Sequence, residues 1–221
     1  MAQATLRLAQ DPDADALLAR DPLALLMGML LDQQFPLEWA FRAPWRLAQR
    51  MERASLDAAE LADWDPDAFV KLMAGPPALH RYPASMAVRV QALCRIVVDT
   101  YGGDASAIWR TATSGKELFA RLRALPGFGE QKARIFVALL GKQLGVQPEG
   151  WREVAGPYGE DGSRRSAADV TDPDTLAEVR AFKQAAKQAA KGDKETQAPK
   201  GGRGARGGQG GQAARGGKGG G

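Results

Sequence analysis

Three of the four Asp-Pro pairs in this chain of 221 residues, Asp21-Pro22, Asp65-Pro66 and Asp172-Pro173, constrain the possible folds more than any other feature. Aspartate is a favoured helix N-cap, and proline is well tolerated at the first helical position. Each pair precedes apolar residues at helical spacing. In residues 23–31 they follow the i, i+3, i+4, i+7, i+8 rhythm of an amphipathic helix. The pairs therefore predict three separate helix starts.

Other helix signals lie between these pairs. Residues 85–101 have apolar positions at helical spacing and stop at Gly102-Gly103. Ser114–Glu117 fits a capping box, and residues 133–144 read as a helix that ends at Gly145. No stretch alternates as a strand between hairpin turns. The sequence predicts an all-α fold.

The last thirty residues differ from the rest of the chain. Residues 192–221 hold 13 of the 26 glycines and no aromatic or aliphatic residue larger than alanine. Such a segment cannot bury enough apolar surface to offset its ordering entropy. We expect a helical domain over residues 1–190 and a disordered, basic, glycine-rich tail over residues 191–221.

Charge is divided unevenly between these parts. Residues 180–221 carry 10 basic and 2 acidic side chains, whereas residues 1–179 have a net charge of −4. The tail resembles glycine-arginine nucleic-acid tails, and a flexible polycation binds phosphates without specificity. The alternative is a tail that only improves solubility. The domain itself must bind any polyanion through a local surface, because its total charge is negative.

Metal centres, disulfides and membrane anchors are not expected. Cys94 and His80 are the only residues of their types, so a multi-cysteine or histidine-based zinc site is not available within one chain. The N-terminus lacks a basic region followed by an apolar run, and the most apolar stretch, residues 23–31, is too short to span a bilayer. These features predict a cytoplasmic protein without cofactor.

The segment that carries chemistry is LRALPGFGEQKARIFVALL, residues 122–140. Gly127 and Gly129 permit positive φ and close approach to another molecule. Glu130 begins a helix whose first amides have no internal partner, and exposed amides beside glycine form a seat for phosphate. A plain helical hairpin with a glycine turn is the alternative. The fuller pattern, with apolar residues on both sides and Ala133 for close packing, resembles the helix-hairpin-helix motif.

Two further segments extend this resemblance. Residues 25–34 (LLMGMLLDQQ) look like the early helix of endonuclease III-like glycosylases, and residues 88–103 are similar to the helix and glycine turn that precede the hairpin there. Over residues 20–155 the chain thus resembles the helix-hairpin-helix-Gly-Pro-Asp (HhH-GPD) superfamily of base-excision DNA repair glycosylases. That resemblance implies a two-lobed helical fold that binds double-stranded DNA containing a damaged base. With one cysteine, the chain cannot hold the iron–sulfur cluster of many relatives.

The resemblance also implies roles for individual residues. Such enzymes flip a damaged base out of the duplex and hydrolyse its N-glycosidic bond. Gln34 matches the glutamine that fills the gap. Gly127, Phe128 and Gly129 match the phosphate-binding turn, and Gln131 and Lys132 follow it.

The lysine nucleophile of bifunctional relatives aligns with Gln131. An amide cannot form a Schiff base, and Lys132 is displaced by about 100° around the helix. A solvated or phosphate-facing lysine is the preferred interpretation of Lys132. The resemblance therefore implies a monofunctional glycosylase without lyase activity.

The family's catalytic aspartate aligns with Glu149, which makes Glu149 the candidate catalytic carboxylate and also a departure from the pattern. A helix start at Pro148-Glu149 is the alternative, with Glu153, Asp161 and Asp169 as further candidate carboxylates. Trp151 is the tryptophan to test for a base pocket. Because of the departures at Gln131 and Glu149, two other functions stay open: a catalytically inactive DNA-binding protein and an interaction module without DNA. No pattern selects one damaged base or an oligomeric state.

Overall fold

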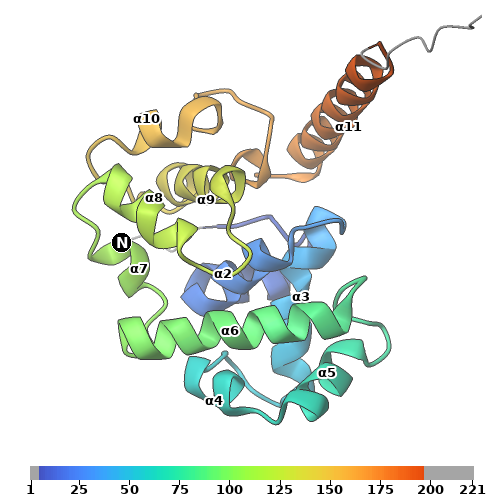
Figure 1. Ribbon diagram of the computed structural model, residues 1–221, viewed down its shortest axis with the longest axis vertical. Coiled ribbons are helices and arrows are strands. Elements are labelled where there is room, and N and C mark those ends of the chain that lie inside the picture. The colour runs from blue at the N-terminus through green and yellow to red at the C-terminus, as the bar shows by residue number, and fades with distance from the viewer. Residues whose placement is uncertain (1–4, 197–221) are drawn as a thin grey trace, which may run out of the picture. The chain divides into compact units, whose positions relative to one another are not determined.

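The computed structural model describes residues 5–196, with side chains through residue 189, and residues 5–196 contain helices and no β-strand (Figure 1). A compact unit ends at Ala185, within the last helix. Of the predicted tail, residues 191–196 form the end of that helix, and residues 197–221 lie outside the described residues. The α-helices are α1 Pro12–Arg20, α2 Pro22–Leu31, α3 Leu37–Arg50, α4 Ala58–Asp63, α5 Pro66–Ala74, α6 Pro83–Tyr101, α7 Ala107–Arg110, α8 Gly115–Arg123, α9 Glu130–Gln143, α10 Trp151–Ala155 and α11 Pro173–Thr196, with short 3-10 helices η1 Gly156–Tyr158 and η2 Ala167–Asp169.

The predicted helix starts are confirmed in atomic detail. Asp21, Asp65 and Asp172 each accept a hydrogen bond from the backbone amide three residues on, with the proline at the first helical position. Ser114 likewise caps α8 by accepting from the Glu117 amide. The return bond of the expected capping box differs, because the Glu117 carboxylate accepts from the amide of Thr113.

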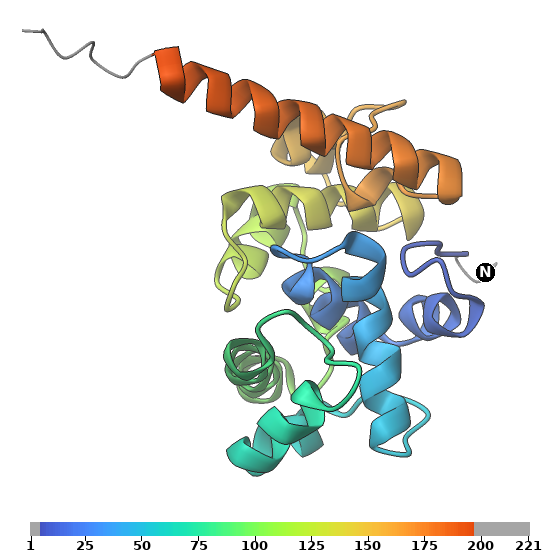
Figure 2. The same cartoon turned by 90° about the vertical axis from the view of Figure 1, so that its right-hand side faces the viewer.

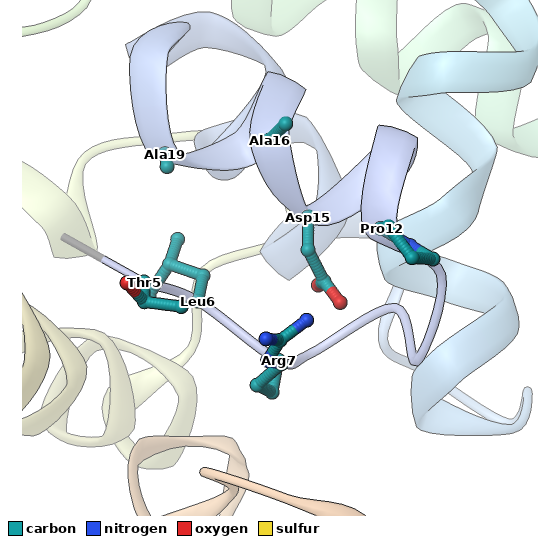
Figure 3. Close-up of a pocket in the computed structure, with 7 residues that line it drawn as sticks. All are labelled: Thr5, Leu6, Arg7, Pro12, Asp15, Ala16 and Ala19. Carbon is teal, nitrogen blue, oxygen red and sulfur yellow. The ribbon is translucent and has the colours of Figure 1, made fainter. Parts of the chain in front are cut away.

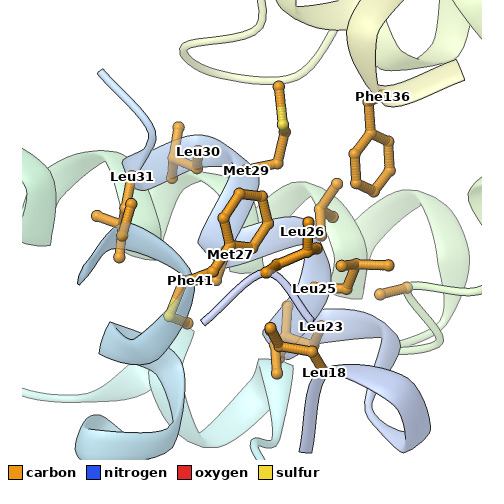
Figure 4. Close-up of a cluster of buried hydrophobic side chains, with 14 of the residues drawn as sticks. Leu18, Leu23, Leu25, Leu26, Met27, Met29, Leu30, Leu31, Phe41 and Phe136 are labelled. Atoms are coloured by element: carbon orange, nitrogen blue, oxygen red, sulfur yellow. The ribbon is translucent and has the colours of Figure 1, made fainter. Parts of the chain in front are cut away.

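Two groups of helices share one hydrophobic core. Helices α1–α6 contact one another, and α7–α10 form a second set of contacts with η1 and η2. Helix α2 lies at the centre, with every residue from Leu23 to Leu31 buried. Figure 4 shows Phe136 of α9 pointing toward the α2 side chains, so the second group packs on the same helix. An all-round apolar helix of ten residues belongs inside a domain. Among residues 5–196, no helix has the length and apolar content that a bilayer-spanning segment needs.

The loop between α10 and α11 is organised by one buried carboxylate. Asp169, with a side chain 1% exposed, binds Lys142 of α9 at 2.7 Å and accepts from the amides of Arg165 and Ser166. Asp169 thus has a structural task, as does Trp151, whose ring packs against Gly141 of α9 and is buried. Neither residue is available for the role that the sequence suggested.

We expect Asp169→Ala to lower the free energy of unfolding by about 3–5 kcal/mol, because it leaves a mostly buried lysine and two backbone amides without their anion. Denaturant titration at neutral pH measures this loss. Asp161→Ala is the matched control, since that carboxylate is 86% exposed and, within the described part of the chain, pairs only with Arg152. Its expected effect is below about 1 kcal/mol. Equal effects of the two variants would contradict the assignment.

Candidate DNA-binding site

The hairpin turn, residues 126–129, joins α8 to α9 and is built on glycine. Gly127 has φ +76°, and a β-carbon there would lie 2.6 Å from Cδ1 of Leu30 in α2. Positive φ and close approach both require glycine at this position. Gly129, at φ −72°, is the N-cap of α9 and supplies no side chain. Because Gly127, Gly129, Glu130 and Gln131 are all exposed, the first amides of α9 face solvent.

The second segment of the site is the glutamine turn, residues 32–35, which connects α2 to α3. Gln34 lies on the surface with φ +52°, a conformation that only a few per cent of non-glycine residues adopt. Backbone strain of this kind is found preferentially at binding and catalytic sites. The structure therefore presents the Gln34 side chain outward from a fixed turn.

These two segments, more than 90 residues apart in sequence, lie side by side (Figure 2). A β-carbon at Gly127 would be 3.8 Å from Nε2 of Gln33. The link is reinforced by Lys132, whose ammonium donates to the carbonyl oxygens of Met29 at 2.7 Å and Leu30 at 2.8 Å. These carbonyls belong to the last turn of α2, where a cation is favourable.

Two predicted binding residues take positions that the sequence did not indicate. Lys132 is mostly buried rather than solvated, and burial lowers its pKa to about 8, opposed by the nearby charge of Asp32. Phe128 is also buried, with its ring 5.9 Å from that of Phe136. Only the backbone of Phe128 remains for a ligand. Gln131 stays exposed, and its amide donates to the hydroxyl of Tyr158 at 2.9 Å.

Glu149, the predicted catalytic carboxylate, does not join the site. Its carbonyl accepts from the amide of Gly115 at 2.7 Å, which fixes it beside the first residue of α8. The hairpin turn lies at the other ends of α8 and α9, and the 14 residues of α9 span about 20 Å. Glu149 was assigned from the family's spacing alone, and in the structure the bond to Gly115 holds it away from the hairpin turn. Glu149 is therefore not in position to act at the hairpin turn.

The glutamine turn is held by two residues that sequence reasoning missed or assigned elsewhere. Arg89 of α6 donates to Oε1 of Gln33 at 2.7 Å. His80 is buried, with Nε2 3.1 Å from the carbonyl of Gln33. Its ring centroid lies 4.8 Å from that of Phe35, with the two rings tilted by 50°. Nδ1 of His80 accepts from the amide of Tyr82, so the ring is the neutral tautomer that donates through Nε2.

Asp32, the first residue of the glutamine turn, is the C-cap of α2 and was also missed. Its side chain is 12% exposed, and Oδ2 lies 3.7 Å from Nζ of Lys183 in α11. The sequence contained a signal for Asp32, because it directly follows a wholly apolar helix. A carboxylate is electrostatically unfavourable at a helix C-terminus.

We expect the stability of the protein to fall as pH drops from about 7 to 5. Burial lowers the pKa of His80 below its ordinary value near 6.5, with Lys132 and Arg89 acting in the same direction. The unfolded chain then binds more protons than the folded one, so this contribution is complete above the unfolded pKa and is lost as pH falls toward the folded pKa.

Thermal unfolding at several pH values tests this expectation. His80→Gln keeps an amide donor for Gln33 and cannot titrate, so its stability should vary less over the same window. His80→Ala should cost about 1–3 kcal/mol at pH 7, since it leaves two backbone groups without partners. If the stability of the wild-type protein and that of His80→Gln depend on pH in the same way, the titration of His80 is not the cause.

A separate hollow of about 210 Å³ lies between residues 5–7 and α1 (Figure 3). Its buried acid, Asp15, accepts from the amides of Ala9 at 2.8 Å and Asp11 at 3.3 Å. Burial raises the pKa of Asp15, while these bonds lower it. Asp15 therefore serves to fold the N-terminal segment onto α1, and we assign no ligand to this hollow.

The glycine hairpin turn and the exposed glutamine turn thus form a single face of the described structure. Comparisons with protein-family models, with curated proteins and with solved structures found no match to this chain.

Proposed function

We propose that this protein binds duplex DNA through the hairpin turn and the glutamine turn, as a member of the base-excision repair class with an HhH-GPD architecture. The observation that carries the proposal is the contact between the two turns. The hairpin turn was assigned to phosphate from its glycines and helix start, and Gln34 to DNA from the family resemblance. Gly127 and Gln33 are neighbours in the structure. One bound duplex can therefore engage both.

The chemistry of the two turns suits different parts of DNA. The uncapped amides at the start of α9 are donors for a backbone phosphate, which is held without sequence readout. Gln34 projects from a strained, exposed turn and supplies a polar side chain that can occupy the space of a displaced base. The ammonium of Lys132 beneath the hairpin adds positive potential.

Within this class we propose a monofunctional DNA glycosylase. Gln131 carries an amide, and Lys132 is engaged with two carbonyl oxygens, which supports hydrolysis by water over a Schiff-base route. The second candidate is a DNA-binding protein without catalysis. The distance of Glu149 from the hairpin favours that candidate, because the expected carboxylate is missing from the site.

Two measurements on the same labelled duplexes test the proposal. Binding should weaken steeply between about 50 and 200 mM salt, as phosphate contacts require. Duplexes with uracil, hypoxanthine, an alkylpurine or oxidised guanine should break only after alkali treatment. Salt-sensitive binding without any break supports the non-catalytic candidate. Absence of duplex binding at low salt would reject both candidates and leave an interaction module.

A further inference from the structure

Asp32 is at an unfavourable position for a carboxylate. It follows Leu31 at the C-terminus of α2, where the helix dipole is negative. Its side chain is 12% exposed, and among residues 5–189 no hydrogen-bond donor reaches its oxygens. Departures from local rules of this kind concentrate at functional sites.

Two lysines from distant helices converge on Asp32. Lys183 of α11 approaches to 3.7 Å, and Lys132 of α9 binds the carbonyls of Met29 and Leu30 just before it. Neither ammonium forms a close ion pair with the carboxylate. The cations offset the charge of Asp32, while its oxygens stay free to act on a bound molecule.

A cavity of about 200 Å³ lies beside this group. Phe35, Pro36 and Leu37 form one wall. The other wall is formed by residues of α11, namely Leu176, Val179, Arg180, Lys183 and Gln184. Lys183 thus borders both the cavity and Asp32. Flipped bases are held between aromatic and apolar side chains with a few polar groups at their edges, which is the composition of these walls.

We propose that Asp32 is the reacting carboxylate of the DNA site and that this cavity receives the displaced base. The inference rests on the proposed glycosylase function and supplies the carboxylate that Glu149 cannot. The N-glycosidic bond breaks with its electron pair passing to the base. Water forms the new bond to C1′ and loses one proton, and the base gains one. The Asp32 carboxylate stabilises the positive charge on the sugar between these events.

The test uses Asp32→Asn in the full chain, with single-turnover base release and duplex binding measured on the same lesion panel. The amide keeps the shape of the side chain and removes its charge. We expect base release to slow at least about a hundredfold while the duplex Kd changes less than about twofold. Asp67→Asn, an exposed carboxylate in the first turn of α5, is the matched control and should match wild type.

Three results would overturn the proposal. Normal base release by Asp32→Asn rejects Asp32 as the reacting carboxylate and leaves the glycosylase function intact. Glu149→Gln then tests whether the Glu149 carboxylate takes part in the reaction. A loss of binding equal to the loss of activity assigns Asp32 to structure. No base release by the wild-type protein on any duplex rejects catalysis as a whole, while salt-sensitive binding still supports the DNA-binding part of the function.

Discussion

Gly129→Asp is expected to weaken duplex binding about tenfold or more without destabilising the protein. Gly129 is the N-cap of α9 with φ −72° and ψ 175°, a conformation that aspartate adopts readily. A β-carbon at this position meets nothing within 4 Å. The new carboxylate would accept from the free amides of α9 and interact favourably with the helix dipole. It would also occupy the position proposed for a DNA phosphate and would repel the phosphate charge.

This substitution separates a binding role from a folding role, because the two effects have opposite signs. Fluorescence anisotropy gives the Kd, and thermal unfolding should give a Tm equal to or slightly above that of the wild-type protein. Ser55→Asp adds the same charge at an exposed position before α4 and should bind DNA as wild type does. Unchanged affinity in Gly129→Asp would remove the hairpin from the DNA-binding face. By contrast, Gly127→Asp is uninformative, because it also strains a positive φ and displaces Leu30.

Trp151→Ala is expected to destabilise the protein by about 3–5 kcal/mol. The indole is 7% exposed. Its ring lies against Gly141, where an added β-carbon would be 2.4 Å from the ring. Truncation opens a cavity between α9 and α10 that the surrounding helices can fill only in part. Because α9 also carries the hairpin turn, a loosened α9 should reduce DNA binding as well.

Denaturant titration measures the loss, with Trp39→Ala as the matched control. Trp39 is 39% exposed, and the guanidinium groups of Arg42 and Arg46 lie 5.4 and 4.8 Å from its ring centroid. Its removal should cost no more than about 1–2 kcal/mol. Gly141→Ala gives an independent check, since overpacking against the Trp151 ring should cost about 1–3 kcal/mol. A Trp151→Ala variant as stable as wild type, with altered choice among lesions, would instead favour the base-pocket interpretation.

The sequence alone determined the all-helical class and the starts of α2, α5 and α11. Asp21, Asp65 and Asp172 cap helices because the aspartate oxygen, the proline ring and the next three amides lie within four residues of one another. The glycine turn at residues 127–129 is equally local, and its positive φ follows from the residue type. The sequence contains such short-range signals, because the interacting atoms belong to residues only a few positions apart in the chain. The 3-10 helix η2 also carries a local signal, a capping box between Ser166 and Asp169, although it was not predicted.

Only the tertiary structure decided which side chains share the site. Lys132 was expected in solvent, and it binds α2 because the packing of α9 brings its ammonium to the free carbonyls of Met29 and Leu30. Glu149 was counted into the site, and a single bond to Gly115 fixes it at the opposite end of the hairpin. Asp32 was not among the predicted site residues, and only the fold places Lys183 beside it. These positions depend on contacts between residues about 35 to 150 apart in the sequence, and residue spacing carries no information about contacts of that range.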